Sequence, residues 1–122
     1  MKIIKTVVVN ETCKTVLALD LETAQTGWQR MRGLIGRSGE DFREGMGLWL
    51  QGCEGIHTIG MSFPIDAAYL DEDCRVVHMY RGIRPYRIGK IKLNARSVLE
   101  LPAGTLDKSR TKIGDRLRFV TA

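Results

Sequence analysis

Long hydrophobic runs and closely spaced cysteines are both missing from this sequence of 122 residues. No apolar run approaches the roughly 20 residues that a membrane-spanning helix needs. The N-terminal MKIIKTVVVN alternates like a strand and has no cleavage-site pattern, so we expect no signal peptide, no membrane partner and a cytoplasmic protein. Cys13, Cys53 and Cys74 are odd in number and far apart, which argues against a disulfide framework or a zinc knuckle and indicates free thiols.

The composition that remains is that of an ordinary globular protein, with 43% hydrophobic and 27% charged residues. A chain of this length can bury its own core, so we expect residues 1–122 to form a single domain. The net charge of +5 is unevenly spread. Acids become rare after Arg81, so the excess positive charge is concentrated in the last third of the chain.

Alternating apolar residues predict a mainly β fold. Residues 2–9 and 14–21 are predicted to form one hairpin and residues 65–70 and 75–81 another, while 47–50, 96–101 and 116–119 are predicted as further strands. The spacing of Ala24, Trp28, Met31 and Ile35 predicts a helix near the N-terminal third. Six or seven short strands with one helix favour a compact antiparallel β-barrel or sandwich of the α+β class.

The stretch CEGIHTIGMSFPIDAAYLD, from Cys53 to Asp71, combines residue types with conflicting needs. Its glycines predict that His57 and Thr58 lie on a loop or at a strand end, and Pro64 suits the first residue of a strand. Asp66 shares a strand face with apolar residues, where an acid is costly unless it is paired. We therefore expect Asp66 to accept hydrogen bonds from backbone amides, Thr58, His57 or Arg32, and Glu100 to pair with a cation on a strand.

Six segments carry a resemblance to a known family: RMRGLIGR, GMGLWL, CEGIHTIGMSFPIDAAYLD, RVVHMYRGIRP, SVLELPAG and IGDRLRF. From Trp28 to Phe119 the chain resembles the domain of unknown function family 192. The resemblance implies a compact, mainly β fold with a helix near the start, in bacterial and archaeal proteins with no agreed biochemical activity. It places the family's motifs on Arg32, Gly33, Leu34, His57, Thr58, Met61, Pro64, Ile65, Asp66 and residues 99–104. Ser62 stands where a cation is common in the family.

Three functional hypotheses follow. The favoured one is a non-enzymatic module that binds a ligand or another protein, with a candidate site at Arg32, Cys53, His57, Thr58, Met61, Asp66 and Glu100. The alternative is a small enzyme that uses Cys53, His57 and Asp66, although nothing in the spacing establishes a nucleophile and its base, a metal or a cofactor. A weaker alternative is phosphate or nucleic-acid binding through the basic run 81–96, where the cations lie beside tyrosines but no known binding motif occurs. This candidate surface comprises Arg81, Arg84, Arg87, Lys90 and Lys92, and an acidic partner would suit it.

Overall fold

The computed structural model describes residues 5–24 and 34–121. Eight strands lie within these ranges: β1 (Thr6–Asn10), β2 (Thr15–Ala18), β3 (Asp20–Ala24), β4 (Met46–Gln51), β5 (Ile65–Leu70), β6 (Val76–Ile83), β7 (Ser97–Pro102) and β8 (Leu117–Thr121). A 3-10 turn, η1 (Gly39–Asp41), and a short helix, α2 (Thr105–Lys108), complete the elements of this part. No helix within the described ranges is long and apolar enough to cross a membrane.

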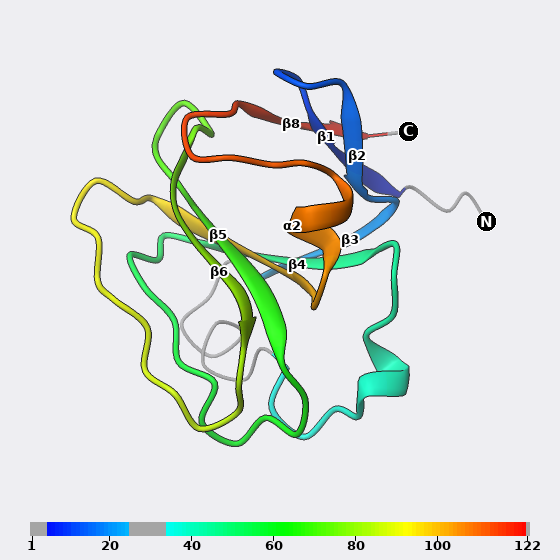
Figure 1. Cartoon of the computed structure of the whole chain (residues 1–122), viewed down its shortest axis with the longest axis vertical. Helices are drawn as coiled ribbons and strands as arrows, with labels where there is room; N and C mark the ends of the chain where they lie inside the picture. Colours follow the sequence, from blue (N-terminus) through cyan, green and yellow to red (C-terminus); the bar gives the residue numbers. More distant parts are fainter. Residues whose placement is uncertain (1–4, 25–33, 122) are drawn as a thin grey trace.

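The strands form two sheets, as Figure 1 shows. The smaller sheet has the order β2-β1-β8 and is antiparallel, and the larger has the order β3-β4-β7-β5-β6. In the larger sheet β3 and β4 are parallel, whereas the other neighbours are antiparallel. The mainly β prediction is therefore confirmed, but the barrel is wrong. Neither sheet closes in the described part, because β3 and β6 remain edge strands with one partner each.

Both predicted hairpins form, as β1–β2 and β5–β6. The expected strand 14–21 is divided, however, because the backbone N–H groups of Leu19 and Asp20 both donate to the carbonyl of Gly45 and turn the chain from one sheet to the other. The middle of the expected helix, residues 25–33, lies outside the described residues. Its first residue, Ala24, ends β3, and its last, Ile35, lies in a turn.

One core lies between the two sheets. Val8, Leu17 and Leu117 of the small sheet pack with buried residues of the large sheet and with Leu106 of α2. The opposite face of the large sheet is covered by connecting segments, which contribute Leu34, Phe42, Ile56 and Met61. Strands β5 and β7 are consequently buried on both faces, and this burial encloses the two acids that they carry.

Candidate functional site

The segment that contains His57 and Thr58 pairs with the basic segment that follows β6. His57 and Ile88 face each other in an antiparallel bridge. Four backbone hydrogen bonds of 2.8–2.9 Å join the two segments. Thr58 donates to the carbonyl of Arg87, and Tyr86 donates to that of Thr58. Gly89 donates to the carbonyl of Ile56, and Lys92 donates to that of Glu54. We refer to residues 54–60 and 84–93 as the ribbon. Its two segments lie along the left and lower left of Figure 1, away from β2 and β3.

The ribbon has an inner and an outer side. Ile56 and Thr58 are buried against the sheet, whereas His57 and Ile59 alternate with them and are exposed. Because Ile88 lies opposite His57, the imidazole and this aliphatic side chain share the exposed side. The prediction that His57 lies on a loop or at a strand end is confirmed, because the residue lies in the connection between β4 and β5.

Thr58 ties the two segments together through its side chain as well. Its hydroxyl donates to the carbonyl of Arg84 at 2.6 Å and accepts the N–H of Arg87 at 2.9 Å. The residue is fully buried. Thr58 therefore organises the turn at the start of the second ribbon segment. The sequence had suggested that Thr58 donates to Asp66, but its hydroxyl donates to the carbonyl of Arg84 instead.

Two tyrosines of the large sheet hold the middle of the ribbon from beneath. The hydroxyl of Tyr69 donates to the carbonyl of Lys90 at 2.7 Å, and the hydroxyl of Tyr80 accepts the N–H of Lys90 at 2.8 Å. Burial, followed by the proximity of Tyr80, raises the pKa of Tyr69 to about 12, so this phenol stays protonated and remains a donor. His78 packs edge-on against both rings.

Glycines permit this close approach. A Cβ atom on Gly89 would lie 2.7 Å from the Tyr69 hydroxyl and 3.2 Å from the Ile56 carbonyl oxygen. A Cβ atom on Gly55 would lie 2.9 Å from the Lys90 carbonyl oxygen. The distances of 2.7 Å at Gly89 and 2.9 Å at Gly55 are too short for a side chain. The spacing of the ribbon therefore requires glycine at these two positions.

The residues proposed for catalysis are not assembled. The Cys53 thiol donates to the Gly55 carbonyl at 2.7 Å, and Nδ1 of His57 accepts the N–H of Ile59 at 3.3 Å. Among the described residues no hydrogen bond joins Cys53, His57 and Asp66, and no group of three His, Cys, Asp or Glu side chains is placed to hold a metal ion. Within residues 5–24 and 34–121, no acid is hydrogen-bonded to His57 and no base is hydrogen-bonded to the Cys53 thiol.

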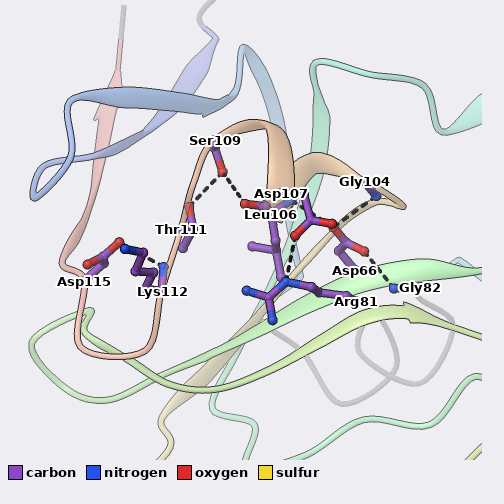
Figure 2. Close-up of polar contacts among 10 residues, drawn as sticks. All are labelled: Asp66, Arg81, Gly82, Gly104, Leu106, Asp107, Ser109, Thr111, Lys112 and Asp115. Atoms are coloured by element: carbon purple, nitrogen blue, oxygen red, sulfur yellow. Dashed lines mark hydrogen bonds and ion pairs between the residues drawn. The ribbon is translucent and has the colours of Figure 1, made fainter.

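Asp66 is fully buried on the β5 face that meets α2, where it accepts three backbone hydrogen bonds. Its Oδ1 accepts the N–H of Gly82 at 2.8 Å, and its Oδ2 accepts those of Gly104 at 3.1 Å and Leu106 at 2.8 Å. Figure 2 shows the carboxylate between these segments. The prediction of backbone amide donors is confirmed, and through them the acid fixes the end of β6 and the start of α2.

Glu100 lies on the opposite face of the large sheet, between Leu48 of β4 and Ala67 of β5. No residue of the described part forms a hydrogen bond or ion pair with its carboxyl group, so the expected cation partner is not seen there. Burial raises the pKa of Glu100 to about 8, which keeps the group neutral at pH 7.

One of the five cations predicted for the basic surface, Arg81, is paired with an acid. Arg81 pairs with Asp107 at 2.9 Å, also visible in Figure 2, and is thereby neutralised. Arg84, Arg87 and Lys90 are exposed on the ribbon and Lys92 is half-buried there, and none of the four has an ion pair with a described residue. Among the other candidates, Met61 is a buried core residue and Arg32 lies outside the described residues.

Sequence reasoning missed two groups of residues. The first is the set of large aliphatic side chains exposed on the second ribbon segment, at 79% for Ile88, 73% for Ile91 and 79% for Leu93. Aliphatic residues inside a run of cations and glycines were the available signal. The second is a buried polar network around Asn10, whose amide donates to Thr111 and Asp115 and anchors β1 to the loop before β8.

Comparison with known proteins identifies the family. Residues 7–119 match the model of DUF192, described as "Uncharacterized ACR". The chain belongs to the DUF192 family. The resemblance noted in the sequence is thus confirmed, and His57 and Thr58, which the resemblance placed in a family motif, lie in the first ribbon segment.

Relatives of this DUF192 chain extend to archaea. It is 33% identical over 66 residues to the UPF0127 protein PH1112 of Pyrococcus horikoshii, a match that covers 54% of this chain and 56% of that protein. The chain thus spans a little over half the length of the curated relative that it matches.

Two crystal structures share the fold. One is a protein of unknown function from Novosphingobium aromaticivorans, with a TM-score of 0.77, 19% identity, and coverage of 93% of this chain and 82% of that one. The other, from Sinorhizobium meliloti, is described as a "putative transcription regulator", with a TM-score of 0.82, 21% identity, and coverage of 96% of this chain and 94% of that one. At these identities the likeness establishes the fold.

Proposed function

We propose that this DUF192 protein is a non-enzymatic docking module that binds its partner through the exposed side of the ribbon. The observation that carries the proposal is the display of large apolar side chains, Tyr86, Ile88, Ile91 and Leu93, on a backbone held by hydrogen bonds. Contiguous exposed apolar groups rimmed by polar residues are typical of interaction sites. A stiff backbone lowers the entropy lost on binding, so its exposed side chains bind more strongly than those of a mobile loop.

The geometry gives less support to the enzyme. Catalysis by a thiol requires a base within hydrogen-bond reach, and Cys53 and His57 each bond to a backbone group instead. Asp66 uses both carboxylate oxygens to hold backbone N–H groups, which leaves it unsuited to moving protons. These residues therefore act in the proposal as supports of the fold and of the ribbon.

Nucleic-acid binding is also less favoured, even though the fold is shared with a protein described as a "putative transcription regulator". Surfaces for single strands present several aromatic rings among cations. The second ribbon segment presents one exposed tyrosine, Tyr86, whereas Ile88, Ile91 and Leu93 are aliphatic and offer no stacking face.

A photo-crosslinking experiment tests the docking proposal. A benzophenone side chain is placed at Ile88 or, as a control, at Leu19, an exposed leucine between β2 and β3, and each protein is irradiated in an extract of cells that express it. Adducts are expected at position 88 but not at 19. Excess unlabelled protein should compete for them, whereas excess of the Ile88→Ser, Ile91→Ser variant should not. Equal adducts at both positions, or equal competition by both proteins, would contradict the proposal.

A further inference from the structure

The charge around the ribbon is mainly positive, with Glu54 as the one acid among residues 54–60 and 84–93. Between Cys74 and Glu100 the sequence has no Asp or Glu, and its basic residues are Arg75, Arg81, Arg84, Arg87, Lys90, Lys92 and Arg96. Acidic neighbours from other elements are few: Asp107 neutralises Arg81, and Glu54 of the first ribbon segment joins Lys92 through its backbone carbonyl, not its carboxylate. A negatively charged partner would therefore complement the ribbon.

The apolar side chains have an equally clear requirement. Ile88, Ile91 and Leu93 lie within six residues of one segment and are each about three-quarters exposed. They are exposed on the segment that also carries Arg87, Lys90 and Lys92, so a partner that covers these aliphatic groups also meets positive charges. Long Lys and Arg side chains can extend toward anionic groups while neighbouring aliphatic groups enter an apolar layer.

We propose, building on the docking function, that the partner of the ribbon is the surface of an anionic lipid bilayer. Ile88, Ile91 and Leu93 enter the boundary between headgroups and acyl chains, and Arg84, Arg87 and Lys90 contact the lipid phosphates. A bilayer accepts protruding side chains in any arrangement, whereas a protein would have to provide a matching pocket for each. Lysine is depleted at protein interfaces but contributes to binding at anionic lipid surfaces.

A second copy of this chain is a poor occupant of the same surface. Two ribbons that met face to face would bring their unpaired cations together, and like charges in contact oppose association. The support from Tyr69 and Tyr80 suits the lipid surface, because the side chains are presented on a fixed backbone rather than ordered on binding.

Vesicle sedimentation tests the inference with the intact protein. At low salt it should bind vesicles of equal parts phosphatidylcholine and phosphatidylglycerol, and it should bind pure phosphatidylcholine at least roughly tenfold more weakly. Ile88→Ser with Ile91→Ser should lower binding to the anionic vesicles by roughly tenfold or more. Leu19→Ser should leave it unchanged. Arg84→Gln with Lys90→Gln should weaken binding more than the matched pair Lys112→Gln with Arg118→Gln, which removes the same charge elsewhere.

The outcomes separate this inference from the docking function. If the protein fails to bind anionic vesicles while the position-88 adducts are still found on a protein, the lipid partner is wrong and the docking module stands. If binding to the vesicles is matched by binding to polyglutamate or to a single-stranded oligonucleotide and the serine variant binds as well as the wild type, attraction is purely ionic and the lipid inference is wrong. If the protein neither binds the anionic vesicles nor forms adducts at position 88, both proposals fail.

Discussion

Two neighbouring acids of the large sheet illustrate how differently a buried carboxyl group can be accommodated. Asp66 on β5 receives three backbone N–H groups from segments that would otherwise have unpaired donors. Glu100 on β7 faces the other side of the sheet between apolar neighbours and is kept neutral by its burial. The first acid stabilises the fold by accepting these three hydrogen bonds, and the second is tolerated because it retains its proton.

Asp66→Asn should destabilise the protein. An amide offers one oxygen acceptor, and its NH2 group would face N–H donors, so at least one of the three backbone bonds is lost. The expected loss is about 2–4 kcal/mol of unfolding free energy, because hydrogen bonds to a charged group are strong and the freed N–H stays buried. Urea unfolding measures it. Glu72→Gln, the same change at an exposed acid, should shift stability by less than about 0.5 kcal/mol. Equal effects of the two variants would show that the backbone bonds of Asp66 are dispensable.

Glu100→Gln should change how stability depends on pH. The pKa of Glu100 is about 8 in the folded protein against an ordinary 4.5, so between these values the folded state holds a proton that the unfolded state has lost. Stability from this group is therefore fully present below pH 4.5 and is lost as pH rises toward 8, by an amount on the order of 4 kcal/mol. The glutamine variant lacks this loss. Its stability relative to wild type should rise steadily from pH 5 to pH 8 in urea titrations. A constant difference for Glu100→Gln would contradict the raised pKa.

At the level of elements, the ribbon depends on the close contact between its second segment and β5. Gly89→Ala places a methyl group 2.7 Å from the Tyr69 hydroxyl, so the segment must move and the bond from Tyr69 to Lys90 is strained or lost. We expect a cost of about 1–3 kcal/mol and faster amide exchange across the ribbon. Gly39→Ala is the control, because its nearest contact would be an ordinary 3.7 Å. Tyr69→Phe removes the clashing oxygen, so the double variant should lose less stability than the sum of the single ones. Strict additivity would mean that the two groups do not meet.

The elements were predicted from the sequence more successfully than their connections. Period-two alternation gave the hairpins β1–β2 and β5–β6, because each pairs neighbours in the chain. The parallel pairing of β3 with β4 depends on a long connection and has no local signal. The division at Leu19 was not predictable either, because it depends on the remote carbonyl of Gly45.

The candidate site follows the same division between local and remote information. An acid in an apolar strand indicated the buried, backbone-bonded Asp66, and the glycines indicated a loop at His57. Three features of the candidate site depend on segments that meet only in the folded chain. They are the pairing of His57 with Ile88, the hydrogen bonds from two tyrosines to Lys90, and the ion pair of Arg81 with Asp107. Residue type alone could not reveal them.

At the scale of the whole molecule, we expect the net charge of +5 and the mainly positive ribbon to oppose binding of the exposed apolar surface to a second copy of itself. Screening should weaken that protection, since the Debye length falls from about 10 Å at 0.1 M salt to about 3 Å at 1 M. Sedimentation velocity should therefore find monomers at low salt and increasing self-association at high salt. Leu19→Ser should behave like wild type, whereas Ile88→Ser with Ile91→Ser should remain monomeric throughout. A dimer that forms at low salt and dissociates as salt is added would instead indicate an ionic interface between two chains, and it would make a second copy, not a lipid surface, the occupant of the ribbon.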